Sequence, residues 1–255
     1  MTLPTNGRSG RRSRGELRIY SDPEQVASAA ADVFVELAAA AIAERGHFDV
    51  ALAGGSTPRR CYELLAQRSS RVDWSRVVIF WGDERYVLAD HPESNYRMAY
   101  EALLAHVPLL PGNVHRARTE MHSAQDAAQS YEDDIRQTFA TLAELPVFDL
   151  VLLGLGTDGH TASLFPKSPA LHEHARLVVA DYVQELEMWR VTMTAPLLNA
   201  ARHIAFLVVG HDKAGVLREV ISGPDNFERL PAQLIEPNAG SLLWIVDEAA
   251  AHLLR

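Results

Sequence analysis

The chain has 255 residues with 47 % hydrophobic side chains, one cysteine and a formal net charge of −9 at pH 7. The acidic balance argues against a nucleic-acid-binding protein, which usually carries a basic stripe. The lack of any run of roughly 18 apolar residues argues against a membrane protein. A single cysteine excludes an intramolecular disulfide and suits the reducing cytosol, so we expect a cytoplasmic protein.

Residues 1–15 are rich in glycine, serine and arginine and lack the apolar segment of a secretory signal. This composition predicts a disordered basic tail, and residues 16–255 are then long enough for one large domain. A predicted strand at 17–20 opens the domain. An alanine-rich helix with Pro23 at its start follows and runs to Arg45.

Apolar strands and helices alternate through the rest of the chain. We predict strands at residues 48–53, 77–81, 148–153, 176–180, 190–194, 204–209 and 242–246. We predict helices at residues 59–67, 123–142, 213–221 and 247–254, and another after Ser94. The near-continuous apolar character of the strands is typical of a sheet that is buried on both faces. The alternation therefore predicts an α/β fold with a mostly parallel sheet covered by helices on both sides.

Three of these strands end in polar segments that contain glycine: GGSTP at 54–58, GDER at 82–85 and GLGTDGH at 154–160. Loops that follow the carboxyl ends of parallel strands lie along one edge of the sheet, where α/β proteins bind their ligands. We therefore expect these three segments to meet at one site.

The GGSTP segment has the composition of a phosphate-binding turn. Gly54 and Gly55 let backbone N–H groups point toward an anion, the hydroxyls of Ser56 and Thr57 add donors, and the following helix presents its N-terminus. No GK[ST] sequence follows, which excludes a Walker A ATPase motif. The alternative is a tight turn in which Thr57 caps the helix.

The GDER segment and the nearby Asn95, which opens the next predicted helix, supply further candidates beside this turn. Arg85 is suited to holding an anionic oxygen. Asp83 or Glu84 would face sugar hydroxyls or a histidine, and Asn95 is a second polar candidate. The alternative is a solvated surface turn.

Asp158 and His160 lie two residues apart in the third segment. Histidine has an unperturbed pKa of about 6.5, which suits a general base, and the neighbouring carboxylate would orient its ring. The alternative is a histidine that caps a helix starting near Thr161. The segment lacks the spacing of a metal site, so we predict no metal.

Two further basic residues are predicted to lie near the same edge of the sheet. Lys213 follows the strand at 204–209 and would stand on the first turn of the next helix. Its charge opposes the helix dipole there, which favours a ligand-binding role. Arg190, at the start of the strand at 190–194, is a similar candidate.

These segments, together with TMTAPLLNAA at 192–201 and GHDKA at 210–214, resemble the 6-phosphogluconolactonases from about residue 17 to the C-terminus. The resemblance implies the fold shared by glucosamine-6-phosphate deaminase, ribose-5-phosphate isomerase and coenzyme A transferases. It implies hydrolysis of a sugar phosphate lactone, 6-phospho-D-glucono-1,5-lactone, in the oxidative pentose phosphate pathway, with no metal or organic cofactor. It also implies that His160 is the general base and that the GGSTP loop, Arg85 and Lys213 bind anionic groups.

One stretch departs from the family pattern, because QELEMWRVTMT at 184–194 replaces a proline-rich approach to the strand that carries Arg190. The nearest alternative function is an amino-sugar-phosphate deaminase. The position of its ring-opening glutamate is Phe165 here, which cannot transfer protons. A second alternative is a sugar-phosphate sensor, although residues 1–15 are too few for a DNA-binding domain. The sequence leaves the oligomeric state, monomer or homodimer, open.

Overall fold

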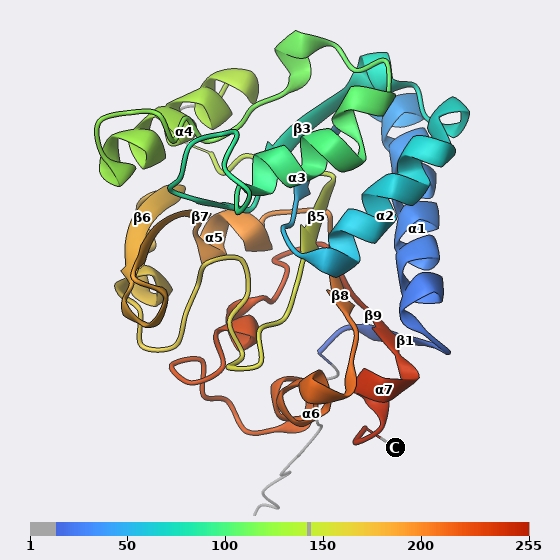
Figure 1. The fold of residues 1–255 in the computed structure, drawn as a ribbon, viewed down its shortest axis with the longest axis vertical. Coiled ribbons are helices and arrows are strands. Elements are labelled where there is room, and N and C mark those ends of the chain that lie inside the picture. Colours follow the sequence, from blue (N-terminus) through green and yellow to red (C-terminus); the bar gives the residue numbers. More distant parts are fainter. Residues whose placement is uncertain (1–13, 142–143, 255) are drawn as a thin grey trace, which may run out of the picture.

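The computed structural model describes residues 14–141 and 144–254 (Figure 1). The predicted tail at residues 1–13 lies outside these ranges, and its disorder stays a prediction. Residues 14 and 15, which the prediction also assigned to the tail, adjoin the domain. The indole Nε1 of Trp244 donates to the carbonyl oxygen of Arg14 over 2.6 Å.

A six-stranded sheet forms the centre of the molecule, in the order β1-β9-β8-β5-β2-β3. Every neighbouring pair is parallel. Its strands are β1 (Glu16–Tyr20), β2 (Phe48–Leu52), β3 (Val77–Trp81), β5 (Leu150–Leu153), β8 (His203–Val208) and β9 (Ser241–Asp247). The predicted parallel sheet is confirmed.

Helices cover both faces of this sheet (Figure 1). They are α1 (Pro23–Arg45), α2 (Ser56–Gln67), α3 (Asn95–Ala102), α4 (Ala124–Thr138), α5 (Ala195–Asn199), α6 (Ala214–Ser222) and α7 (Glu248–Ala251). Leu150 and Leu152 of β5 belong to the core shared with α1, α2 and α3. Val151 and Leu153 belong to the core shared with α4 to α7. Alternate residues of one strand thus enter opposite cores, which explains its continuous apolar sequence.

The first helix, α1, is long and apolar enough to cross a membrane by length and composition. In this fold it is a core helix, because Val26 and Phe34 are fully buried in the core that it shares with the sheet. Asp22 caps its start by accepting a hydrogen bond from the backbone N–H of Gln25 at 2.8 Å. Gly46, with φ at 83°, ends it in the left-handed conformation that favours glycine.

A second, smaller sheet is antiparallel and has the order β4-β7-β6. Its strands are β4 (Asp83–Arg85), β6 (Val178–Val183) and β7 (Met188–Met193). The prediction of GDER as a loop was therefore wrong, because its last three residues form a strand. The register pairs Asp83 with Thr192 and Arg85 with Arg190, which brings the two arginines together.

Several predicted helix boundaries also differ from the structure; the last helix, for example, ends at Ala251 rather than at residue 254. α2 begins at Ser56 rather than at residue 59, and α4 ends at Thr138 rather than at 142, shortly before Ala140 takes a positive φ of 49°. No helix begins near Thr161 in the described chain, where turns and one bridge to Leu164 stand instead.

Candidate active site

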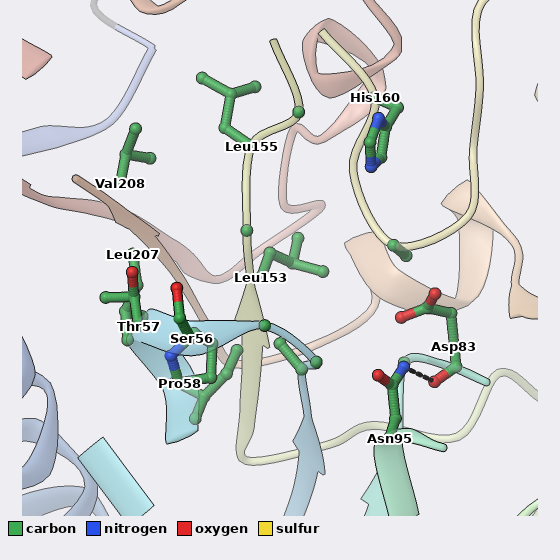
Figure 2. A pocket seen from close by; sticks show the side chains of 18 of the residues that line it. Ser56, Thr57, Pro58, Asp83, Asn95, Leu153, Leu155, His160, Leu207 and Val208 are labelled. Atoms are coloured by element: carbon green, nitrogen blue, oxygen red, sulfur yellow. Dashed lines mark hydrogen bonds between the residues drawn. The ribbon is translucent and has the colours of Figure 1, made fainter. Parts of the chain in front are cut away.

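A cleft of about 630 Å³ opens at the carboxyl ends of β2, β5 and β8, beside β4. Every predicted site residue except Glu84 and Asp158 lines it: Gly54, Gly55, Ser56, Thr57, Asp83, Arg85, Asn95, His160, Arg190 and Lys213. Figure 2 shows Ser56 and Thr57 on one side, His160 on the other, and Leu153 between them. The structure thus brings the three polar segments to one cleft.

One wall of the cleft is the start of α2. Its N-cap is Gly55, with φ at 102°, and no described side chain caps this end. The alternative in which Thr57 is the cap is therefore wrong. Gly54 is required because a Cβ there would lie 2.0 Å from Oδ1 of Asn95. The N–H groups of an uncapped first turn, with two hydroxyls beside them, favour an anion.

Glu84 points into the protein rather than into the cleft. Its carboxylate accepts hydrogen bonds from the backbone N–H of Arg85, Asn95 and Tyr96, at 2.7–2.8 Å, and from the Ser94 hydroxyl at 3.1 Å. Burial raises the pKa of Glu84, although these backbone hydrogen bonds act against the rise. Glu84 therefore fixes the start of α3 against β4 and places two cleft residues.

Asp83 and Asn95 form the opposite wall (Figure 2). The Asn95 side-chain amide donates to the Asp83 carbonyl oxygen at 2.9 Å, and the Ser163 hydroxyl donates to the Asp83 carboxylate at 2.5 Å. The buried Oδ1 of Asn95 accepts no hydrogen bond from the described residues. A buried polar atom without a partner is rare in proteins and favours a bound group that completes it.

Arg85 and Arg190 stand side by side across the β4–β7 pair. Arg190 is only 8 % exposed, and burial lowers the pKa of its guanidinium while the charge of Asp83 opposes that shift. Arg85 donates to the carbonyl oxygen of Glu93 at 2.6 Å. The Nε atoms of both arginines are buried without a hydrogen-bond partner among the described residues. The pair therefore offers positive charge and free donors to an oxygen-rich ligand.

His160 is held by the carboxylate behind it. Its Nδ1 lies 2.6 Å from Oδ1 of Asp158, which also accepts its backbone N–H at 3.1 Å. Burial raises the pKa of Asp158, but the hydrogen bond and charge of His160 outweigh this effect and lower the pKa below its usual value. An ionised carboxylate only accepts hydrogen bonds, so Nδ1 carries a proton, and in the neutral imidazole Nε2 is then the nitrogen with the free lone pair.

The loop around His160 is built for this orientation. A Cβ on Gly156 would lie 2.1 Å from Nδ1 of His160 and 2.5 Å from Oδ1 of Asp158. The ring stacks on Phe165 with centroids 4.2 Å apart. Since no helix starts near Thr161, the alternative of a capping histidine is wrong. Phe165 cannot exchange a proton, so it serves as an apolar packing surface for the ring.

Lys213 stands at the end of a short 3₁₀ turn, η7 (His211–Lys213), directly before α6. Its helix thus starts one residue later than predicted. Its side chain is 23 % exposed, and its Nζ lies 3.7 Å from Oδ2 of Asp212, which is too long for a hydrogen bond. Since no hydrogen bond to it is found among the described residues, the ammonium group has donors for a ligand in the cleft.

Sequence analysis missed several residues around the cleft. Leu186 and Asp212 line it. Ser163 and Thr192, both fully buried, tie the His160 loop to the second sheet, because the Ser163 N–H donates to the Thr192 hydroxyl at 3.3 Å. The sequence feature that could have identified Ser163 and Thr192 is a hydroxyl residue within an otherwise apolar segment.

Within the described chain, no three His, Cys, Asp or Glu side chains form a group that could hold a metal ion.

The chain is similar to known proteins over most of its length. The sequence pattern of the glucosamine-6-phosphate isomerases/6-phosphogluconolactonase family matches residues 21–244. A 6-phosphogluconolactonase of Synechocystis sp. is 44 % identical over 84 % of this chain and 88 % of its own. One of Nostoc sp. is 39 % identical over 92 % and 96 %.

Solved structures give the same result. A 6-phosphogluconolactonase from Trypanosoma cruzi superposes with a TM-score of 0.85 at 31 % identity, over 95 % of this chain and 97 % of that one. A monomeric glucosamine-6-phosphate deaminase, at 18 % identity and a TM-score of 0.79 over 93 % and 99 % of the two chains, shares the fold. The chain belongs to the glucosamine-6-phosphate isomerase/6-phosphogluconolactonase family.

Proposed function

We propose that this protein hydrolyses 6-phospho-D-glucono-1,5-lactone to 6-phospho-D-gluconate, the second step of the oxidative pentose phosphate pathway. One observation carries the proposal: a histidine oriented by an ionised carboxylate shares a cleft with an uncapped helix N-terminus and a lysine. A base at one end and an anion site at the other match a lactone that carries a phosphate. The relatives named 6-phosphogluconolactonase support the same reaction.

His160 is the general base in this proposal. Its Nε2 takes a proton from a water molecule, whose oxygen attacks the lactone carbonyl carbon C1. Asp158 holds the ring and stabilises the imidazolium that forms. When the C1–O bond of the ring breaks, the imidazolium returns the proton to the leaving oxygen. A lactone is an activated ester, so the protein needs no covalent nucleophile.

Arg85 and Arg190 stabilise the oxyanion that develops on the carbonyl oxygen of C1. Their buried Nε–H groups are fixed donors, and fixed donors stabilise a developing charge without reorganising during the reaction. Asp83 and Asn95 lie beside them and would bind the sugar hydroxyls.

The phosphate binds at Gly54, Gly55, Ser56, Thr57 and Lys213. This end is remote from C1, so phosphate binding orients the sugar at the reacting carbon. The protein needs no metal or organic cofactor and works in the cytoplasm on a small-molecule substrate. Excess EDTA should leave its activity unchanged.

A lactonase assay coupled to 6-phosphogluconate oxidation tests the proposal. We expect the wild type to hydrolyse the lactone in this assay. We expect His160→Ala to lower kcat by roughly 10²–10⁴-fold, the range for a lost general base. His106→Ala, an exposed histidine outside the cleft, is the matched control. Full turnover in a folded His160→Ala variant would contradict the assigned role.

A further inference from the structure

Beyond the cleft, the turn that carries Lys213 is tied to the C-terminal helix. Gly210, with φ at 101°, precedes this turn, and the backbone N–H of Lys213 donates to its carbonyl oxygen at 3.1 Å. The position of Lys213 is therefore set by the position of Gly210. A Cβ on Gly210 would lie 2.6 Å from Oδ1 of Asp212, so the turn needs glycine there.

Asp247, the last residue of β9, holds Gly210 in place. Its side chain accepts the Gly210 N–H with both carboxylate oxygens, each at 3.1 Å. The same carboxylate caps α7 by accepting the N–H of Ala250 at 2.7 Å. Asp247 is only 2 % exposed, so these hydrogen bonds are protected from water. One buried charge thus joins the start of α7 to the turn before Lys213.

A second contact joins the same two elements. The ring of His252, directly after α7, stacks on the ring of His211 in η7, with centroids 4.2 Å apart and planes inclined by 19°. α7 also packs against α6, the helix that follows Lys213 (Figure 1). The turn is therefore held at two adjacent residues, Gly210 by Asp247 and His211 by His252. Both residues come directly before Asp212 and Lys213.

We propose that Asp247 and His252 are positioning residues that hold the η7 turn so that Lys213 presents its ammonium group to the substrate phosphate. The inference rests on the proposed function. Neither residue lines the cleft, and both act through the turn. Their removal weakens recognition of the phosphate group and leaves the base at His160 in place.

Asp247→Ser separates the two roles of the carboxylate. Serine is a good helix cap, so α7 keeps its cap, but its single short hydroxyl does not replace two oxygens on Gly210. We expect kcat/KM for the phosphorylated lactone to fall about tenfold, the low end for a lost hydrogen bond to a charged group. The loss for unphosphorylated glucono-1,5-lactone should be at least about fivefold smaller.

Asp22→Ser is the matched control, because Asp22 also caps a helix that follows a strand and does not line the cleft. It should leave the preference for the phosphorylated lactone unchanged. In a Lys213→Met background, Asp247→Ser should lower kcat/KM for the phosphorylated lactone by less than about twofold, since contributions that act through one group are not additive. An undiminished loss in that background, or an equal loss for both lactones, would overturn the assignment.

Two further measurements keep the test decisive. If Asp247→Ser does not fold, His252→Ala leaves the α7 cap intact and should show the same selective loss for the phosphorylated lactone; an equal loss for both lactones overturns the assignment. If the wild type does not hydrolyse the lactone, the proposed function fails. Titration with inorganic phosphate then tests the positioning of Lys213 by itself. A higher Kd for phosphate in Asp247→Ser or His252→Ala than in the wild type supports the assignment, and an unchanged Kd overturns it.

Discussion

Gly156 shows how single residues create the site. The space that a side chain would fill at this position is occupied by the His160 ring and the Asp158 carboxylate. A glycine on this loop therefore does more than allow a turn, because it lets the candidate base and its partner meet at 2.6 Å. The same holds for Gly54, whose missing Cβ leaves room for the Asn95 amide.

Gly156→Ala should lower kcat by about 10²-fold, since a displacement of about 1 Å at a catalytic group costs that much. The new methyl group has to push the ring away from the carboxylate, while the phosphate end of the cleft is unaffected. Steady-state kinetics should therefore show a fall in kcat with a smaller change in KM.

Gly154→Ala is the control in the same loop, because a Cβ there meets no atom within 4 Å. It should reduce kcat far less than Gly156→Ala. Equal losses in the two variants would mean that any methyl group in this loop disturbs catalysis, and the steric explanation would be wrong.

At the scale of secondary-structure elements, the site depends on the junction between β4 and α3. Glu84 is the centre of this junction, since its carboxylate receives four hydrogen bonds from β4 and from the start of α3. It joins Arg85 on the strand to Asn95 on the helix. A carboxylate that serves only as an acceptor suits a position surrounded by donors.

Glu84→Gln should lower the free energy of unfolding by about 1–3 kcal/mol, because an amide NH₂ then faces buried N–H donors. KM for the lactone should rise as Arg85 and Asn95 shift. Urea denaturation and kinetics measure both effects. The surface variant Glu120→Gln breaks an exposed ion pair with Arg116 and should cost less than about 1 kcal/mol. Equal stability of the two variants would contradict this role of Glu84.

The elements differ in how far the sequence predicted them. β2, β3, β5, β8 and β9 of the main sheet were predicted well because each is a short, mostly apolar run. β4 was not, because its three residues are all charged, and such a segment becomes a strand only through its partner β7.

In the site, too, some residues could be predicted from the local sequence and others could not. His160 and Lys213 follow apolar strands and were found from position alone. The bonds of Ser163 to Asp83 and Thr192 join residues 80 and 29 positions apart, which no local pattern records.

For the molecule as a whole, the carboxyl and amino ends of the parallel strands carry different groups. The cleft lies at the carboxyl ends of the strands, whereas two neighbouring carboxyl groups, Asp49 and Asp149, are buried at the amino ends. Asp149 is paired with Arg45 at 2.7 Å and Arg202 at 3.3 Å. Burial, opposed by His47 and reinforced by the charge of Asp149, raises the pKa of Asp49 to about 6.

This shift predicts how stability depends on pH. A carboxyl whose pKa is raised in the folded state binds its proton more tightly there, so its ionisation destabilises the fold as pH rises from about 4 through 6. Asp49→Asn removes this ionisation. The variant should exceed the wild type in free energy of unfolding by about 1–3 kcal/mol at pH 8. The advantage should shrink as the pH falls from 6 to 4.

Urea unfolding at pH 4, 6 and 8 measures this dependence. Asp90→Asn, at an exposed aspartate outside this pair, is the control, and its difference from the wild type should vary with pH less than that of Asp49→Asn. A difference between Asp49→Asn and the wild type that does not vary with pH would contradict the ionisation of Asp49 as its cause.

The order of the main sheet also governs when the chain acquires its shape. β1 stands at the edge of the sheet and has β9, the last strand, as its only neighbour among the described strands. During synthesis β1 therefore has no partner strand in this sheet until β9 has been made. α1 packs early on α2 and β2, but the part of it that packs on β8 and β9 stays uncovered until those strands are made. Such distant pairing slows folding and prolongs exposure of apolar surface. The main sheet is therefore complete only once β9 has been made.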